Sequence, residues 1–141
     1  MATWRQQQAD SKGENVKTVQ YLLNARGATL DVDGLFGPLT TAAVEDFQGE
    51  NGLVTDGIVG DLTWPKLIID LKLGSTGDAV RAVQSQINTG TAEVHISFLT
   101  VDGIFGAATD GAVRTFQLEN QLNVDGVVGP ATWQTMVFWD D

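Results

Sequence analysis

Cysteine is absent from this sequence of 141 residues, and histidine occurs once. Without cysteine the chain can have no disulfide, no thiolate metal site and no cysteine nucleophile. The single histidine, His95, falls short of the two or three that zinc hydrolase sites usually contain. The residues therefore predict no catalytic centre, no bound metal and no cofactor, and we expect His95 to be exposed.

Positive charge and long apolar runs are also scarce. Eighteen Asp and Glu against eight Lys and Arg give a formal net charge of −10, which is shared evenly by the two halves of the chain. A strongly negative surface disfavours nucleic acids and anionic membranes as partners. No stretch approaches the roughly 18 apolar residues that span a bilayer, so we expect no membrane insertion.

A secretory signal is not visible, because Met1 is followed by polar residues rather than by an apolar segment. We therefore expect one of two locations. The chain is extracellular if it is exported by another route or after removal of a signal. Otherwise it is cytoplasmic or associated with an assembled particle.

The dominant feature that is present is an internal repeat. Residues 33–40, Asp-Gly-Leu-Phe-Gly-Pro-Leu-Thr, return as residues 102–109, Asp-Gly-Ile-Phe-Gly-Ala-Ala-Thr, and shorter versions occupy residues 56–63 and 125–132. Asp and Gly favour tight turns, because Asp bonds nearby backbone and Gly accepts positive φ. The spacing of these aspartates does not match a calcium-binding loop. The residues expected to shape turns are Asp33, Asp56, Asp102 and Asp125.

Helical periodicity flanks every turn. Apolar residues recur at the spacing of one helical face in residues 16–23, and the pattern returns in residues 80–87. The predicted helices cover about residues 14–24, 38–51, 61–69, 77–87, 107–120 and 130–137. This arrangement predicts an all-α fold made of two tandem three-helix bundles joined by a short linker.

The repeat also defines the expected domains. Residues 1–12 form a leader, in which we expect Trp4 to pack on the first module. The first module covers residues 13–70, and the second, including its linker, covers residues 71–141.

The second module carries five extra residues between its first helix and its first turn, within Thr89–Thr100. Val94, Ile96 and Phe98 alternate with polar residues in this insertion. Alternation of this kind is typical of a short strand. We therefore expect a small β-like insertion in the second module.

Repeated aromatic residues are expected in the core, because aromatic side chains carry much of the burial in a small domain. Their helical spacing and their exact repetition favour packing over sugar stacking. The core aromatics are Phe36, Phe47, Trp64, Phe105, Phe116 and Trp133.

Four amide side chains are the candidate ligand contacts. Gln48 and Gln117 follow a core Phe, where a buried amide can tie loop backbone together or line a groove. Asn51 and Asn120 end the second helix of each module, beside the next turn. We expect these two asparagines to be the leading ligand-binding residues.

The combined pattern of Val-x-x-Val-Gln, Asp-Gly-x-Phe-Gly, Val-x-x-Phe-Gln and Thr-Trp resembles the peptidoglycan-binding domain-like family. The resemblance covers residues 13–70 and 77–137, nearly the whole chain. Ala107 departs from it, since a Pro usually stands there, as Pro38 does in the first copy. The family consists of small three-helix modules found beside cell-wall hydrolases.

The resemblance implies a non-catalytic protein that binds bacterial peptidoglycan, at the stem peptide or the glycan–peptide junction. It also implies a cell-wall hydrolase as a possible partner and the cell wall as the location. An alternative is a structural or adaptor component of a phage-like particle, injection or secretion device that reuses the fold. A minimal hydrolase is disfavoured by the lack of a catalytic cluster. An inhibitory propeptide of a metalloprotease is excluded, because that role uses a Cys.

Overall fold

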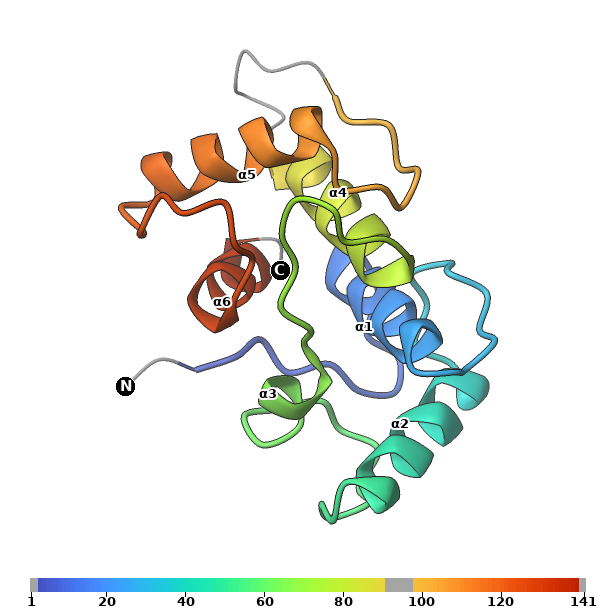
Figure 1. Ribbon diagram of the computed structural model, residues 1–141. Helices are drawn as coiled ribbons and strands as arrows, with labels where there is room; N and C mark the ends of the chain where they lie inside the picture. Colours follow the sequence, from blue (N-terminus) through green and yellow to red (C-terminus); the bar gives the residue numbers. More distant parts are fainter. Residues whose placement is uncertain (1–2, 91–97, 140–141) are drawn as a thin grey trace.

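Two sets of three helices make up the protein, as the sequence predicts (Figure 1). The structure is a computed structural model that describes residues 3–90 and 98–139. Within these residues it contains isolated β-bridges but no β-strand. The β-like insertion expected within Thr89–Thr100 lies largely outside the described residues. The helices are α1 (Glu14–Ala25), α2 (Pro38–Glu50), α3 (Trp64–Leu67), α4 (Asp78–Gly90), α5 (Ala107–Glu119) and α6 (Pro130–Trp139).

The first helices of the two modules, α1 and α4, form the centre of the molecule. They pack together more extensively than any other pair of described helices, while α2 and α5 lie at opposite ends (Figure 1). The apolar positions predicted for α1 and α4 are buried, with Val16, Val19, Val80 and Val83 fully so. The two modules therefore share one continuous core.

The third helix is shorter in the first module than the predicted span of residues 61–69. It ends at Leu67, and Ile68 already has the extended conformation (φ −65°, ψ 154°). The chain leaves the helix there because Leu71 pairs with Val128 of the second module. The counterpart, α6, extends to Trp139, the last of the described residues.

The leader and the linker play the same part in their modules. Gln7 of the leader exchanges two backbone hydrogen bonds with Val59, as Leu71 of the linker does with Val128. The indole N–H of Trp64 donates to the carbonyl oxygen of Arg5 at 2.8 Å, and that of Trp133 donates to the carbonyl oxygen of Ile69 at 2.9 Å. Each module is thus completed by the segment that precedes its first helix.

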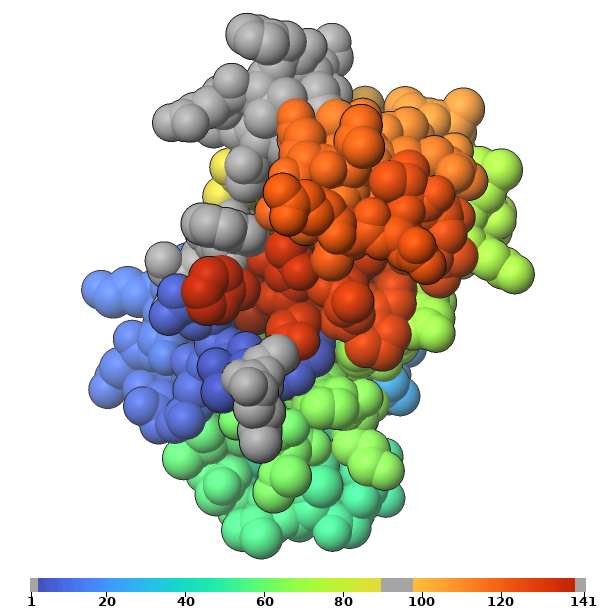
Figure 2. Space-filling view, turned by 90° about the vertical axis from the view of Figure 1, so that its left-hand side faces the viewer, coloured from blue at the N-terminus to red at the C-terminus, as the bar shows by residue number. Residues whose placement is uncertain are grey.

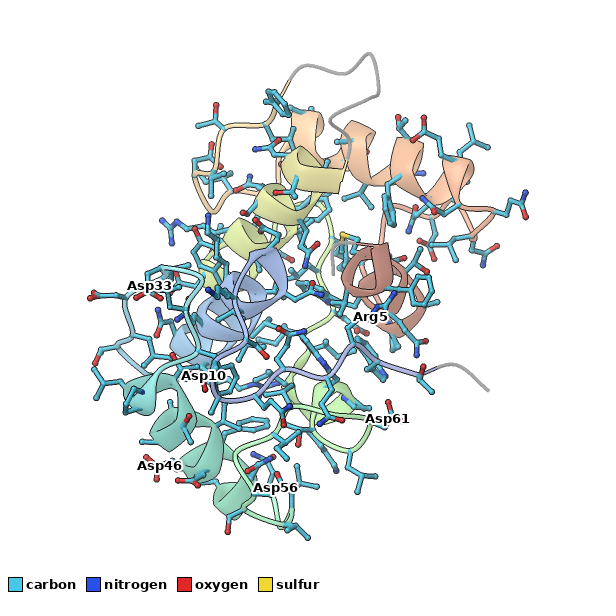
Figure 3. The ribbon with its side chains drawn as sticks, turned by 180° about the vertical axis from the view of Figure 1, so that it is seen from behind. Arg5, Asp10, Asp33, Asp46, Asp56 and Asp61 are labelled. Carbon is cyan, nitrogen blue, oxygen red and sulfur yellow. The ribbon has the colours of Figure 1, made fainter. Side chains whose placement is uncertain are left out.

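The N-terminal segment also joins the two modules. Trp4 stacks on Trp64, with 5.5 Å between the ring centroids. Arg5 lies over the ring of Phe138 at 4.6 Å and donates to its carbonyl oxygen. Figure 3 labels Arg5 near α6 and Asp61 near α3, and Figure 2 shows the blue N-terminal segment beside the red atoms of α6 on one face. The N-terminal segment therefore links α3 of the first module to α6 of the second.

The core aromatics are where the repeat predicts them. All six are buried, from fully buried Trp64 and Trp133 to Phe116, which is 8% exposed. Phe47 and Phe116 occupy the same position of α2 and α5. Their rings hold the outer helices against the centre of the molecule.

Every Asp-Gly turn is held by a glutamine from the preceding helix, in an arrangement that we call the glutamine clasp. In the first clasp the Gln20 side-chain nitrogen shares its two hydrogens among three oxygens, Asp33 Oδ1, the Leu35 carbonyl and Thr40 Oγ1, at 2.9–3.1 Å. Its oxygen accepts the backbone N–H groups of Asp33 and Gly34. The glutamine therefore ties its own helix, the turn and the start of the next helix together.

The same clasp occurs four times. Its glutamines are all 1% exposed, and the glycines of the turns all have φ between 73° and 76°. That backbone conformation favours glycine, which explains the invariant Asp-Gly pair within the chain. The clasp glutamines, with the aspartates that they bind, are Gln20 with Asp33, Gln48 with Asp56, Gln84 with Asp102 and Gln117 with Asp125.

Hydrogen bonds to the turn carboxylates favour their charged form. The Gln20 amide and the backbone N–H of Leu35 lower the pKa of Asp33. The pKa of Asp102 is lowered first by the backbone N–H of Ile104 and then by Gln84. The pKa of Asp125 is lowered first by the backbone N–H of Val127, with Gln117 contributing against the effect of desolvation. These turns are therefore most stable when the carboxylates are ionised.

The contact between α1 and α4 is polar on one side and apolar on the other. The Gln86 amide nitrogen donates to Asn15 Oδ1 at 2.9 Å and to Thr18 Oγ1 at 2.7 Å, and Asn15 Nδ2 donates to the carbonyl oxygen of Val137. By the repeat, Ala79 and Ala82 replace Asn15 and Thr18 in the second module, and Leu22 replaces Gln86 in the first. All six positions are buried. The polar set therefore breaks the symmetry of the contact.

Removing a core ring is expected to destabilise the fold. Phe47→Ala or Phe116→Ala leaves a cavity beneath α2 or α5, and each should lower the free energy of unfolding by about 3–5 kcal/mol. Urea denaturation measures this loss. Leu39→Ala and Leu118→Ala are the controls, because these side chains are 78% and 68% exposed on the same helices. Equal effects of the core and control substitutions would contradict the packing.

Acid should weaken the clasps. Because the folded-state pKa values of Asp33, Asp102 and Asp125 are lowered, the stability that they contribute is fully present above the unfolded-state pKa of about 3.9. It is lost as the pH falls through the lower folded-state pKa values. We expect the thermal midpoint of the wild type to fall below about pH 4 more steeply than that of the Asp33→Asn, Asp102→Asn, Asp125→Asn triple variant.

Asparagine keeps the accepting oxygen of each clasp and removes only the titration. The control is Asp31→Asn, since Asp31 is exposed and accepts no hydrogen bond among the described residues. Parallel pH profiles for the triple variant and the wild type would show that these carboxylates do not carry the acid sensitivity.

The symmetry of the repeat provides a test of the polar contact. Asn15→Ala alone leaves one buried N–H of Gln86 and the carbonyl oxygen of Val137 without their Asn15 partner, and should cost about 1–3 kcal/mol of unfolding free energy. The triple variant Asn15→Ala, Thr18→Ala, Gln86→Leu copies the apolar side of the contact. It should recover part of that loss, because it removes the buried Gln86 amide and leaves only the Val137 carbonyl without its donor. Chemical denaturation measures the unfolding free energy of both variants. A triple variant that is less stable than Asn15→Ala would contradict this account of the polar contact.

Candidate functional site

Shallow hollows lie beside three of the Asp-Gly turns, and we call them the turn hollows. Each is formed by the residues before the turn, the turn itself and the start of the next helix, and each has a volume of about 230–240 Å³. Apart from Gln6 and Gln84, their lining residues lie within 53–63, 99–109 and 122–132, at equivalent positions of the repeat. The clasp therefore builds the same surface feature three times.

The turn hollows differ at their edges. The hollow of the first module has Val54 and Leu62 there, which are 76% and 75% exposed, together with Gln6 of the leader. The equivalent hollow of the second module has Asn123 and Ala131 at the same two positions. The first-module hollow is therefore the more apolar of the two.

Asn51 and Asn120 lie at equivalent places beside these hollows. They are the residues after the last of α2 and of α5, two positions before the hollow-lining Leu53 and Leu122. Their side-chain nitrogens donate to the carbonyl oxygens of Phe47, at 2.8 Å, and of Phe116, at 2.9 Å. Each amide oxygen has no partner among the described residues, which leaves it free to accept a bond from a ligand.

Gln48 and Gln117 lie inside the clasps rather than on the surface. Both are 1% exposed, and the hydrogen bonds of the clasp occupy the nitrogen and the oxygen of each amide. In this arrangement their side chains shape the turns that border the hollows. The turn aspartates are exposed, and each accepts the backbone N–H of the residue two positions further on.

A fourth hollow, which sequence reasoning missed, lies between the C-terminal end of α1 and one face of α2. We call it the α1–α2 hollow, and its volume is about 190 Å³. The only signal in the sequence is a difference between the copies, since Arg26 of the first module corresponds to Gly90 of the second. The hollow is lined by Leu23, Arg26, Gly27, Ala28, Ala43, Asp46, Phe47 and Glu50.

The described residues offer no metal site, since no group of three or more His, Asp or Glu is placed to hold an ion within residues 3–90 and 98–139. His95 lies outside the described residues. None of the helices in the described part of the chain has the length and apolar character required to cross a membrane.

Comparison with known proteins agrees with the resemblance drawn from the sequence. The model of the family described as "Putative peptidoglycan binding domain" matches twice, at residues 12–67 and 76–136. A Kitasatospora aureofaciens protein described as "Uncharacterized protein in bpoA1 3'region" is 49% identical over 69 residues, which cover 48% of this chain and 58% of that protein. The zinc D-Ala-D-Ala carboxypeptidase of Streptomyces albus G is 42% identical over 102 residues, covering 70% of this chain and 36% of the enzyme.

Among solved structures, a peptidoglycan-binding protein from Clostridioides difficile, in complex with glutamine hydroxamate, shares 38% identity with a TM-score of 0.44. The match covers 45% of this chain and 40% of that one. The chain spans less than two thirds of the length of these relatives. The family model, in contrast, matches both modules almost completely. This chain belongs to the putative peptidoglycan binding domain family.

Proposed function

We propose that the chain binds bacterial peptidoglycan without catalysis, at the stem peptide or the glycan–peptide junction, through the turn hollows beside Asn51 and Asn120. The observation that carries the proposal is the equivalence of these hollows in two modules of a chain of this family. A polymer with a repeating unit can engage both. Two linked sites then bind more tightly than one, provided that the ligand can reach both.

The geometry suits a peptide better than a charged polymer. The acidic chain, with a net charge of −10, repels anionic wall polymers, whereas a peptide presents amide groups and small apolar side chains. The amide oxygens of Asn51 and Asn120 can accept N–H bonds from a peptide backbone. Val54 and Leu62 provide apolar contact in the first module.

The names of the relatives support this proposal. The Streptomyces albus G relative is named as a zinc D-Ala-D-Ala carboxypeptidase, and this chain covers 36% of it. We infer that the present modules act as the wall-holding part of such a system, with a cell-wall hydrolase as partner and the cell wall as the place of action. An adaptor in a phage-like particle, in contrast, would not bind purified cell wall.

A pull-down on purified, protein-free sacculi tests the proposal. The wild type should sediment with the wall. Asn51→Ala and Asn120→Ala each remove one amide contact of about 0.5–1.5 kcal/mol, and should each weaken binding about 2–12-fold, with a larger loss in the double variant. Each single variant leaves the site of the other module intact and therefore measures the binding that this other module provides.

Circular dichroism of the same variants separates site from scaffold, because an unfolded variant says nothing about binding. A folded wild-type protein that stays in the supernatant would exclude wall binding and support the adaptor role. Wall binding that is unchanged in the folded double variant would exclude the two asparagines as contacts.

A further inference from the structure

The α1–α2 hollow differs from the turn hollows because charges of both signs surround an apolar floor. We infer that it binds a zwitterionic amino-acid group on a short aliphatic stem, such as the free end of a diamino acid in a stem peptide. The inference rests on the proposed function, since it names the part of the wall that the first module recognises.

The floor of the hollow is apolar. Leu23 and Phe47 are 3% and 5% exposed, so their side chains are held in the core and only their edges reach the hollow. Ala28 and Ala43 are half-buried and keep the space open by their small size. A volume of about 190 Å³ accommodates a short aliphatic chain, and such a chain gains free energy by covering this floor.

One wall of the hollow is the guanidinium of Arg26. Its Nε and Nη2 donate to the carbonyl oxygens of Lys66, Leu67 and Ile68 at 2.9–3.2 Å. The group lies 5.3 Å from the centre of the Phe47 ring. Nη1 has no hydrogen-bond partner among the described residues. Arg26 is thus fixed in position and still has a donor group available for a carboxylate.

Another part of the lining is negative. Asp46 and Glu50 lie one turn apart on α2, and neither has a hydrogen-bond or ion-pair partner among the described residues (Figure 3 labels Asp46). The C-terminal end of α2, which has no basic residue in its last turn, also borders the hollow. Helix C-termini carry partial negative charge, which adds to that of the carboxylates. This wall favours an ammonium group.

A ligand with only one charge meets an unfavourable charge on one side. A lone carboxylate is attracted by Arg26 but repelled by Asp46 and Glu50, and a lone ammonium group meets the reverse. The α-amino and α-carboxyl groups of an amino acid, which share one carbon atom, can meet Arg26 and the two carboxylates at once. Charge complementarity of this kind provides specificity more than affinity.

The second module does not repeat this arrangement. Gly90 and Thr115 stand where the first module has Arg26 and Asp46, and only Glu119 keeps the charge of Glu50. One chain should therefore bind one such group, in its first module. The turn hollows are repeated, whereas this site is single.

A nitrogen-15 NMR titration of the full chain tests the inference with three matched probes. Free meso-diaminopimelic acid carries two zwitterionic ends, pimelic acid lacks the amino groups, and cadaverine lacks the carboxyl groups. Diaminopimelic acid should shift the amide signals of Gly27, Ala28, Phe47 and Glu50 at one site per chain. Pimelic acid and cadaverine should bind at least ten times more weakly, as expected if each lost charge pair costs about 1.4 kcal/mol or more.

Isosteric variants test which charged side chains of the α1–α2 hollow contact the ligand. Asp46→Asn with Glu50→Gln changes only exposed groups of α2 and should abolish the diaminopimelic acid shifts in a chain whose spectrum remains that of a folded protein. Glu45→Gln with Glu119→Gln is the matched control, because Glu45 is exposed on α2 outside the hollow and Glu119 is the counterpart of Glu50. It should leave the shifts unchanged.

Arg26→Gln should also abolish the shifts, and its unfolding curve shows whether the lost bonds to α3 matter. Three results would overturn the inference: no shift around the hollow with diaminopimelic acid, equal binding of cadaverine, or unchanged shifts in the Asp46→Asn, Glu50→Gln variant. Sacculus binding by the wild type reports on the proposed function separately. A chain that sediments with sacculi but ignores diaminopimelic acid keeps the proposed function and loses this site.

Discussion

The fold depends on a buried amide that must satisfy its own hydrogen bonds. A glutamine side chain with almost no exposure has two N–H donors and an oxygen, and leaving them unpaired would cost free energy at each position. The clasp solves this by drawing the Asp-Gly turn and the Thr of the next helix onto the glutamine. Each helix that carries a clasp thereby determines where the following helix begins. Because this happens four times, most of the chain path follows from one local interaction.

The sequence was informative wherever the repeat reports on local geometry. Apolar spacing predicted the helices, and the repeated aromatics predicted a core in which Trp64 and Trp133 are fully buried. The same reasoning could not predict how one module meets the other. The spacing of residues on α1 says which face is buried but not against what, so the bonds of Gln86 to Asn15 and Thr18 had no signature.

Non-local pairing was also hidden in the sequence. The leader and the linker share little identity, and they are equivalent because of the backbone bonds of Gln7 and Leu71. The short α3 follows from the same pairing. Asn51 and Asn120 remain proposed contacts, two positions before residues that line the turn hollows, whereas the α1–α2 hollow is formed by residues of two different helices and had no signal of its own in the sequence. Arg26 differs from its counterpart Gly90, but a single difference between copies does not indicate a hollow.

The two copies therefore have a common frame and different surfaces. The clasps and core rings are kept in both modules, while the hollow edges and the Arg26 wall are not. Such a division is expected when packing constrains the interior and recognition constrains the surface. We propose that the chain combines a repeated peptide-binding surface with one additional charged site in its first module.

The most direct measurement is an NMR map of the full chain with a lysozyme digest of purified peptidoglycan. We expect amide shifts at residues bordering the turn hollows, such as Leu53 and Gly57, and at their counterparts Leu122 and Gly126, with the α1–α4 contact unchanged. A spectrum that does not respond to the digest, or one whose changes are confined to α1 and α4, would contradict the account.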